Sequence, residues 1–492
     1  MTILTTLQFI VNIIIVFFLF SVLVMGAVLL FKDKRQKQHS VLRNYPLLAR
    51  IRYFGEKIGP ELRQYLFLAD TKGKPFSRND FTNIVVAGKY NSRMTSFGTQ
   101  HDYEDGFYIQ NTMFPLQTAE LHIDQSPMIS SFIYKIDNER LFNRDEHRTK
   151  VEIDPYYLSD EDQIILGAQL KHPFKIKRLV GQSGMSYGAL GSRAITALSK
   201  GLGQAGTWMN TGEGGLSEHH LSGNVDIIFQ IGPGLFGVRD KAGKFDQQAF
   251  IDLSHNQHIK AFEIKLEQGA KTRGGHMQGN KVTEEIASIR KVEPWVTINS
   301  PNRFEHIDSP DALLNWVHEL QQTGQKPVGF KMVISKVSEV ENLVRTMVEN
   351  QQYPNFITID GGEGGTGATF QELEDGVGLP LFTALPILTA LLEKCGMMIS
   401  VGCIMSQQCH MNTCPVGVAT TDPKREKGLI IDEKKYRVTN FITSLHEGLF
   451  NISAAIGVDS PTKITKEHII IKNKDGGIQS IQDYKLKLIE HA

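Results

Sequence analysis

The amino-acid sequence predicts an α/β protein, a TIM-like (β/α)8 barrel that follows one N-terminal transmembrane helix. Three observations predict it. The first 31 residues carry no charged side chain. From about Phe174 onward, short β-rich runs alternate with helix-like stretches, which implies parallel strands joined by helices. Glycine, asparagine and acidic residues follow several of these runs, as they do at the carboxyl ends of barrel strands. A doubly wound sheet is the alternative, because spacing alone does not decide whether a sheet closes.

Residues 1–31 form the expected membrane anchor. The stretch 7–31 is apolar almost throughout, and about 20 such residues suffice to span a bilayer. The basic segment KDKRQK (32–37) follows directly, so the positive-inside bias predicts that the rest of the chain is cytoplasmic. The start of the chain lacks the basic segment and the cleavage site of a secretory signal. We therefore expect a single-pass protein of the cytoplasmic membrane.

Charge and cysteine content exclude two classes of protein. Lysine plus arginine and aspartate plus glutamate number 53 each, so the chain lacks the basic excess typical of nucleic-acid binding, and no nucleic-acid partner is expected. All four cysteines lie between Cys395 and Cys414. A secreted disulfide protein would distribute its cysteines through the fold. A local group favours ligation of a metal or an iron–sulfur cluster.

The soluble part divides into three expected regions: an N-terminal cytoplasmic region at 32–150, the barrel at 151–460 and a C-terminal tail at 461–492. In the first region, apolar spacing over 44–67 predicts a helix interrupted at Gly59–Pro60. Segments 75–80 and 96–108 are predicted to be loops between short strands. No chemistry is indicated there. The strands predicted for the barrel are FKIKRLVG, GTWMN, VDIIFQIG, AFEIKL, KPVGFKMVIS and NFITIDGG, with helices such as SRAITALSKGL and VSEVENLVRTMVEN between them.

Two glycine-rich turns end predicted strands: NTGEGG (210–215) and DGGEGGTGA (360–368). Consecutive backbone N–H groups without Cβ crowding can hold phosphate or flavin oxygens, which makes Gly361 and Gly362 candidate cofactor-binding residues. Glu213, inside the first turn, is a candidate to orient a substrate amine or polarise a bound group. The alternative is a solvated loop acid, and either turn alone is a weak signal.

Two lysines at strand ends are candidates for a flavin site. Lys271 lies in the loop 269–282 that follows AFEIKL, and Lys331 lies in VGFKMV. A lysine at such a position can stabilise the negative charge on the N1–C2 edge of a reduced flavin. For either lysine taken singly, an ordinary surface position is the more common interpretation.

The cysteines of the loop 403–417 have the spacing C-x5-C-x4-C-P. Thiolates are the usual ligands of iron–sulfur clusters, and three of them in one compact loop suit a three-iron (3Fe-4S) cluster better than a four-cysteine zinc site. The expected ligands are Cys403, Cys409 and Cys414. Cys395 is outside the spacing. Three buried cysteines without a metal remain the alternative on spacing alone.

These motifs together resemble a known family. GMSYGAL, NTGEGG, the GAK-led loop, SPNRF, DGGEGGTGA, GLPLFTALP and CIMSQQCHMNTCPVGVAT occur in the order seen in the synthase domain of glutamate synthases, over roughly residues 175–455. The resemblance implies a TIM barrel that carries FMN beside a three-iron cluster. In that family, electrons pass through the cluster to FMN, and reduced FMN delivers hydride to 2-iminoglutarate, formed from 2-oxoglutarate and ammonia.

The resemblance also assigns roles to individual residues. Glu213 matches an active-site acid, Lys271 a lysine near flavin and substrate, and Arg290 an arginine for a substrate carboxylate, which suits its bidentate geometry. The positions expected to contact FMN are Met185, Ser186, Gly188 and Lys331, and the cluster ligands are the three cysteines of the loop. His276 stands where full-length enzymes have a substrate-contacting glutamine.

No glutamine-hydrolysing nucleophile domain precedes the match. The resemblance therefore implies free ammonia, a partner glutaminase or an amine such as methylamine as nitrogen donor. An electron donor such as a ferredoxin or a reductase subunit is also implied.

The match departs from the family inside the barrel. In the family, a strand, a helix and a further strand separate the GLPLFTALP helix from the cysteine loop. Here only eight residues lie between Lys394 and Cys403, so about forty residues, including strands seven and eight of an eight-strand barrel, are absent. That part of a barrel commonly binds phosphate. We therefore expect an incomplete barrel, weak FMN binding and little or no synthase activity.

Three alternatives follow from this departure. The chain is an FMN oxidoreductase, a degenerate and non-catalytic membrane-bound member that scaffolds a partner, or a sequence that has lost an internal segment near residues 394–397.

Overall fold

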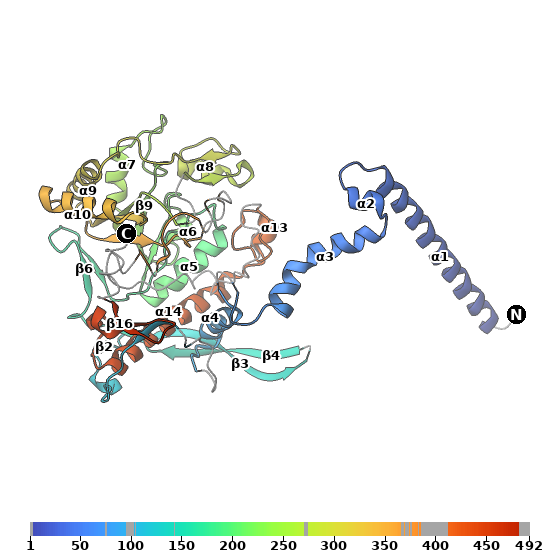
Figure 1. Cartoon of the computed structure of the whole chain (residues 1–492), viewed down its shortest axis with the longest axis horizontal. Coiled ribbons are helices and arrows are strands. Elements are labelled where there is room, and N and C mark those ends of the chain that lie inside the picture. The colour runs from blue at the N-terminus through green and yellow to red at the C-terminus, as the bar shows by residue number, and fades with distance from the viewer. Residues whose placement is uncertain are drawn as a thin grey trace. The chain divides into compact units, whose positions relative to one another are not determined.

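The computed structural model describes residues 3–73, 76–94, 103, 105–141, 143–269, 274–365, 369, 373, 376–381, 383–384 and 412–481 (Figure 1). Its contacts divide the chain into two compact units, Met1–Phe81 and Thr82–Ala492. The predicted boundary at residue 150 lies within a strand of the second unit, Asn143–Ile153.

The first unit is helical. α1 (Ile3–Arg35) is continuous, and its segment Leu7–Arg35 contains an 18-residue stretch with a mean hydropathy of 3.1, of which none is buried. Such a helix is long and apolar enough to cross a membrane, although a signal sequence would meet the same criteria. α2 (Ser40–Asn44) and α3 (Leu48–Leu62) follow, and α3 continues into a π-helical turn, η1 (Arg63–Phe67).

The predicted interruption at Gly59–Pro60 is wrong, because Pro60 lies inside α3. Proline removes one backbone N–H and crowds the carbonyl four residues earlier. The π-helical turn that begins three residues later is the type of local irregularity that accommodates such a defect without ending a helix.

The second unit is built on a five-stranded parallel sheet with the order β14-β13-β10-β9-β8. Its strands are β8 (Trp208–Asn210), β9 (Asp226–Ile231), β10 (Ile259–Lys265), β13 (Val328–Val333) and β14 (Ile357–Asp360). A parallel bridge from Gln182 to Met209 adds the preceding segment next to β8. Each strand therefore pairs with the next strand of this sheet along the chain. A doubly wound sheet would reverse its winding direction, so the order excludes that alternative.

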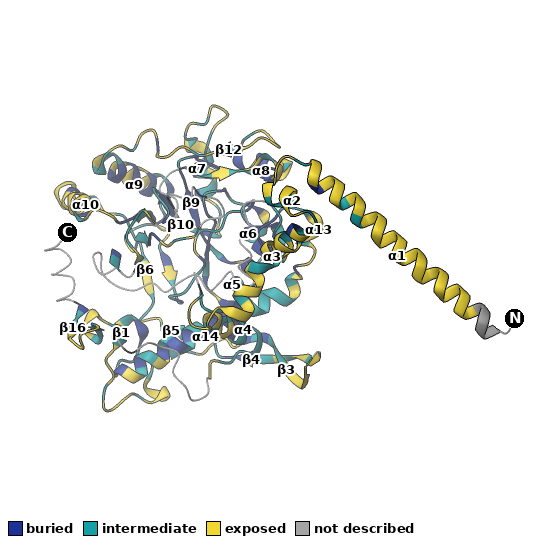
Figure 2. Ribbon diagram, turned by 45° about the vertical axis from the view of Figure 1, so that its right-hand side comes forward, coloured by how far each residue is buried: buried dark blue, intermediate teal, exposed yellow. Residues whose placement is uncertain are grey.

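The helices that connect these strands pack on one face of the sheet. They are α5 (Ser192–Ala205), α6 (Glu218–Leu221), α7 (Gln247–Ser254), α8 (Glu284–Arg290), α9 (Pro310–Gly324) and α10 (Val337–Asn350). Phe229, Phe262 and Phe330 of the strands join Phe250 of α7 and Trp316 of α9 in one apolar cluster. The buried residues lie between the sheet and these helices (Figure 2). Helices on one face are the arrangement of a barrel, and the described strands form a curled half-barrel.

The long helix α14 (Ile431–Ile456) packs beside α5, as the last helix of a barrel lies beside the first. It follows the short helix α13 (Pro423–Glu426). Asn440 of α14 donates hydrogen bonds to the carbonyls of Gly88 and Phe132 and accepts one from Ser131. These bonds connect α14 to helix α4 (Arg78–Tyr90) and to the long hairpin β3–β4 (Ile129–Arg140 and Asn143–Ile153).

The remaining strands form small antiparallel sheets: β1 (Gly106–Ile109) with β15 (Ile469–Lys472) and β16 (Ile478–Ser480), β2 (Ile123–Asp124) with β5 (Tyr157–Leu158), β6 (Ile164–Leu166) with β7 (Phe174–Ile176), and β11 (His276–Met277) with β12 (Ile298–Asn299). Short 3-10 turns occupy Thr118–Glu120, Gly279–Lys281, Pro461–Lys463 and Lys466–His468.

Two local predictions are corrected here. Residues 78–80 begin α4 instead of forming a loop, because Ser77 and Asp80 exchange the hydrogen bonds that start a helix. FKIKRLVG supplies only β7, which pairs antiparallel with β6.

Candidate functional site

Polar side chains gather on the face of the sheet opposite the helices, toward the carboxyl ends of the strands. Residues 263 and 265 of β10 alternate with buried apolar residues, so both point to this face. Glu263 is register partner of Gln230 on β9, and Lys265 is register partner of Lys331 on β13. Asp360 ends β14. The strands thus bring together residues that are far apart in the sequence.

Glu263 is the centre of a buried hydrogen-bond network and is only 3% exposed. Its Oε1 accepts hydrogen bonds from Asn210 Nδ2 at 2.9 Å and Gln230 Nε2 at 2.6 Å, and its Oε2 accepts one from Thr358 Oγ1 at 2.5 Å. Asn210 Oδ1 in turn accepts the backbone N–H of Gly212 at 2.9 Å. One carboxylate therefore connects three strand ends to the NTGEGG turn, which fixes the position of that turn.

Glu213 forms an ion pair with Lys265, whose Nζ lies 2.9 Å from Glu213 Oε1. The side chains are only 17% and 9% exposed, so solvent screens the pair weakly. The carboxylate lies close to Gly232, where a Cβ atom would stand 2.6 Å from Glu213 Oε2. Lys265 Nζ also donates to Gln268 Oε1 at 3.1 Å. Sequence reasoning identified Glu213 but missed Lys265 and Glu263.

Arg290 ends α8 and is 4% exposed. Its Nη2 donates to the carbonyl oxygen of Tyr187 at 3.1 Å, and its guanidinium lies over the ring of Phe236. Burial lowers the pKa of Arg290 to about 10, and the nearby Glu213 opposes this shift. Its Nε has no hydrogen-bond partner among the described residues. A buried donor without a partner is unfavourable unless a ligand or water completes it, which is compatible with the predicted role toward a substrate carboxylate.

The turn predicted to pack against FMN lies beside the NTGEGG turn. A Cβ on Gly212 would stand 2.7 Å from the backbone nitrogen of Ser186, and a Cβ on Gly214 would stand 2.7 Å from the Ser186 Cβ. Gly188 has φ +98°, which disfavours any other residue. The carbonyl of Met185 accepts a hydrogen bond from the Nε2 of buried His220. The two turns are thus in contact.

Lys331 and Asp360 form a second ion pair, 3.0 Å apart. The same Asp360 accepts the backbone N–H of Gly269 at 3.1 Å. Gly361 and Gly362 pack closely against the segment 377–381, and Gly362 N donates to the carbonyl of Leu379. For these two glycines, close contact between chain segments explains the residue type without a cofactor.

Three predicted residues, Lys271, Cys403 and Cys409, lie outside the residues that the structure describes. Cys414 is described, and it is a buried free cysteine, 4% exposed. The backbone N–H of Gly191 donates to the carbonyl of Val418 at 2.9 Å. The end of the cysteine loop therefore lies against the segment that follows the Met185–Gly188 turn.

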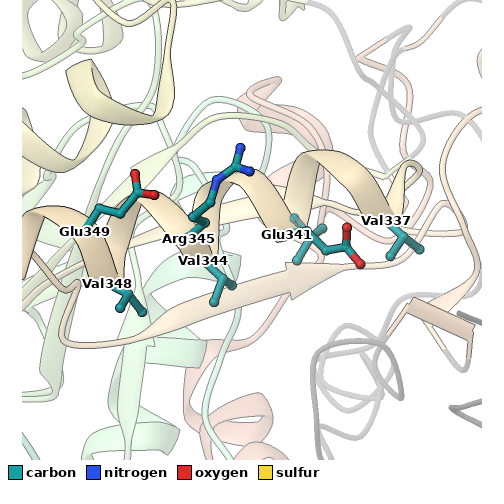
Figure 3. Close-up of a pocket in the computed structure, with 7 residues that line it drawn as sticks. Val337, Glu341, Val344, Arg345, Val348 and Glu349 are labelled. Carbon is teal, nitrogen blue, oxygen red and sulfur yellow. The ribbon is translucent and has the colours of Figure 1, made fainter.

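Two hollows accompany these residues. A small pocket is lined by Glu213, Lys265, Gln268, Gly275 and Asn302, among others. A larger hollow runs along α10, lined by Val337, Val344 and Val348 with charged neighbours, and it contains none of the predicted site residues (Figure 3). His276 lies near the small pocket in sequence, exposed, with its Nδ1 2.8 Å from Asn299 Oδ1.

The described residues fit the polar edge of a flavin. Lys265 and Lys331 are register partners on adjacent strands, so their two ammonium groups lie side by side. The closely packed glycine turns place backbone groups near these lysines. Each lysine is paired with a carboxylate, so the site carries no large excess of charge. Of the donor set expected for a cluster, one buried thiol, Cys414, is described.

Comparison with known proteins adds an independent line of argument. The family model for the conserved region in glutamate synthase matches residues 117–397 and 391–459. The glutamate synthase large subunit-like protein YerD of Bacillus subtilis (strain 168) is 50% identical over 499 aligned positions, which cover 94% of this chain and 95% of that protein. The archaeal-type glutamate synthase (NADPH) of Thermotoga maritima is 26% identical over 403 positions, 74% of each chain.

The same comparisons bear on the missing segment. The family match comes in two parts that overlap at residues 391–397. The 499 aligned positions with the Bacillus protein exceed the 492 residues of this chain, so the chain lacks residues that its relative has. Both findings agree with the predicted gap after Lys394. Among solved structures, a mutant mandelate oxidase with benzaldehyde aligns at 12% identity and a TM-score of 0.36, over 75% of this chain and 86% of that one. A score this low carries no conclusion.

Proposed function

Because the chain belongs to the family defined by the conserved region of glutamate synthase, we propose that it is an FMN- and iron–sulfur-dependent oxidoreductase. The proposed reaction is the reductive amination of 2-oxoglutarate to glutamate, or to a related N-substituted amino acid. The observation that carries the proposal is the Glu213–Lys265 ion pair at the carboxyl end of the parallel sheet, where ligands bind in folds of this kind.

The residues of the chain have distinct proposed tasks. Lys265 holds the carboxylate of Glu213 in place, and that carboxylate orients the nitrogen of the substrate amine or imine. Arg290 binds a carboxylate of the 2-oxo acid through the donor that has no described partner. Lys271 is proposed to lie near flavin and substrate. Enclosure of these groups by strand ends strengthens their electrostatic interactions, because little water screens them.

FMN, when bound, supplies the two-electron reduction of the carbon–nitrogen double bond. Lys331, Met185, Ser186 and Gly188 are proposed to hold it, together with the turn at Gly361–Gly362. Cys403, Cys409 and Cys414 are proposed to hold a 3Fe-4S cluster, which receives electrons from a ferredoxin or a reductase subunit. The hydrogen bond from the backbone N–H of Gly191, three residues after the Met185–Gly188 turn, to the carbonyl of Val418, directly after the cysteine loop, supports this route.

The enzyme test uses the full chain purified in detergent and supplied with excess FMN. Because the excess FMN compensates for weak binding, we expect ammonium-dependent glutamate formation from 2-oxoglutarate with a reduced viologen as electron source. Glu213→Gln should lower kcat/KM by roughly 10²-fold or more, because it removes a positioned charge. Glu218→Gln, on the neighbouring helix α6, is the matched control. Turnover that Glu213→Gln leaves unchanged would contradict the proposal.

The cluster test measures iron and acid-labile sulfide. Cys409→Ser should abolish both together with the broad visible absorbance, whereas Cys395→Ser should leave them. Loss of iron in Cys395→Ser would show that the proposed ligand set is wrong.

A second candidate function is that of a non-catalytic membrane-bound member that scaffolds a partner. The gap after Lys394 favours it, because that part of a barrel commonly binds phosphate. Titration of FMN into the purified chain distinguishes the two. Absence of flavin binding at any FMN concentration, with no turnover, would refute the enzyme function for this chain and favour the scaffold.

We also propose that α1 is a single-pass anchor in the cytoplasmic membrane and that the second unit is cytoplasmic. The apolar length of α1 and the basic residues at its end support this. A protease-cleavable tag placed after residue 40 should resist protease added to intact cells and should be cleaved after lysis. Cleavage of the tag in intact cells would show that the second unit lies outside the cell.

A further inference from the structure

The first unit carries an exposed apolar surface that lies outside α1. Helix α3 and the turn after it expose Ile51, Phe54 and Leu66 at 69%, 62% and 68%. These residues belong to one face, because their spacing follows the helical repeat. The apolar face of α3 is defined by Leu48, Ile51, Phe54, Ile58, Leu62 and Leu66. Such a face is normally buried against protein when water surrounds a helix.

The opposite side of α3 is charged. Arg52, Lys57 and Arg63 are exposed there beside Glu56 and Glu61, and Arg52 forms an ion pair with Glu56 at 2.7 Å. The basic excess belongs to the whole segment 32–67, which has nine lysines and arginines but three acidic residues, whereas the whole chain has zero net charge. An apolar helix face within a segment of net positive charge is typical of helices that lie in the interface of an anionic membrane.

An ion pair between buried Asp33 and half-exposed Arg50 connects the start of α3 to the end of α1. Asp33, in the last turn of α1, is fully buried. Its Oδ2 accepts hydrogen bonds from Arg50 Nε at 2.9 Å and from the backbone N–H of Leu47 at 3.1 Å, and its Oδ1 pairs with Arg50 Nη2. The rings of His39 and Tyr53 add a contact, 5.3 Å between centroids. The first turn of α3 is therefore held where α1 ends.

We propose that α3 is a second membrane-binding element, lying in the interface of the leaflet where α1 ends. Its apolar face enters the boundary of the acyl chains, and the exposed lysine and arginine side chains of the segment 32–67 contact anionic lipid head groups. The inference rests on the proposed anchoring by α1. Three features support it: the exposed apolar face, the basic excess of the segment 32–67 and the connection through Asp33. Long basic side chains can reach head groups while their stems lie along the apolar boundary.

The test places a photoreactive benzoyl-phenylalanine at single positions of the full chain in cell membranes. Phe54 reports on the apolar face, Lys57 on the opposite side of the same helix, and Phe17 on α1. We expect lipid adducts at Phe17 and Phe54, with a several-fold lower yield at Lys57. No lipid adduct at Phe17 would refute the anchor itself. Adducts at Phe17 combined with none at Phe54, or with Phe54 cross-linked to protein, would refute the interfacial position of α3 alone.

A second arm tests the charge of the lipid. The full chain is reconstituted in vesicles of phosphatidylcholine, with or without phosphatidylglycerol. The adduct yield at Phe54 should be several-fold higher with the anionic lipid, and the double change Arg52→Glu and Lys57→Glu should reduce it to the yield in the neutral vesicles. Equal yields in both vesicles before the change would refute the contact with anionic head groups.

Discussion

The middle of the parallel sheet and its β14 edge are packed very differently. Six of the seven residues of β10 are buried, and five of the six in β9. None of the four residues of β14 is buried. On α10, Val344 and Val348 are 49% and 61% exposed (Figure 3). The hydrophobic core therefore becomes thinner from β10 toward β14.

This difference coincides with the break in the family match. In a complete barrel, the strand after β14 would cover its open edge, and the next helix would cover the outer side of α10. The described residues contain no such strand beside β14. The open edge of β14 and the thin core beside it, both seen in the described residues, are what the predicted gap after Lys394 would produce.

The largest expected effect comes from restoring those neighbours. Inserting the corresponding segment of the Bacillus relative after Lys394 should tighten FMN binding by several powers of ten. Two or three charge-assisted hydrogen bonds to the phosphate, at roughly 1.5–3 kcal/mol each, account for this gain. FMN fluorescence titration measures it, with a glycine–serine insert of equal length as control. Near-stoichiometric FMN retained by the chain without the insert would contradict the prediction.

A core substitution compares the two regions directly. Phe262 is fully buried, with ring centroids 4.6 Å from Phe250 and 6.0 Å from Phe229. Phe262→Ala should lower the free energy of unfolding of the second unit by about 3–5 kcal/mol. Val348→Ala at the thin edge should change it by less than about 0.5 kcal/mol. Denaturant unfolding followed by tryptophan fluorescence measures both, and similar losses would mean that the edge is packed after all.

The sequence predicts what depends on local pattern. The uncharged run of α1, the five strands of the parallel sheet (β8, β9, β10, β13 and β14) and helices α5 and α10 follow from composition and periodicity. The carboxyl-end position of Glu213 follows from strand order. The hairpin β3–β4 was not predicted, because β4 is charged or polar at every position before Val151 and the two strands pair with each other instead of entering the main sheet.

The buried polar network shows a different limit. Glu263 and Lys265 alternate with apolar residues in AFEIKL, a period-two signal that could have identified an inner polar face. The sequence alone does not identify the hydrogen-bond partners of Glu263, because Asn210, Gln230 and Thr358 come from separate strands. Long-range register, not residue type, decides that this glutamate is a structural centre and not a solvated acid.

The well-packed side also contains a titratable group with a predictable pH effect. His220 is fully buried, and burial lowers its pKa to about 4. Its Nε2 donates to the Met185 carbonyl, and its Nδ1 lies 2.8 Å from Ser217 Oγ, an arrangement that the neutral ring satisfies.

Because the unfolded ring takes up a proton near pH 6.5 and the folded ring near pH 4, stability from this group is full above pH 6.5. It is lost as the pH falls to 4, by about 3 kcal/mol. The free energy of unfolding is measured from pH 6.5 to pH 4 for the original chain and for His220→Gln. The original chain should lose about 3 kcal/mol more over this range than the variant. Parallel profiles would show that folding does not lower the pKa of His220.

The smallest expected effect sharpens the comparison between core and edge. Val344 is half exposed on α10, so Val344→Ser should change the stability of the chain by less than about 0.5 kcal/mol. In the chain with the restored segment, the following helix should cover this side of α10 and exclude water from it. The same substitution should then cost about 1–2 kcal/mol, because it removes buried methyl groups at about 0.8 kcal/mol each and leaves a hydroxyl to be satisfied.

Glu341→Gln, on the same hollow, is the control for a change of charge without loss of apolar contact. The double comparison isolates the coupling between Val344 and the inserted segment, since effects on the rest of the second unit cancel. An equal, small cost in both chains would show that the segment does not pack on α10, and the thin edge would then be a property of the fold and not of the missing residues.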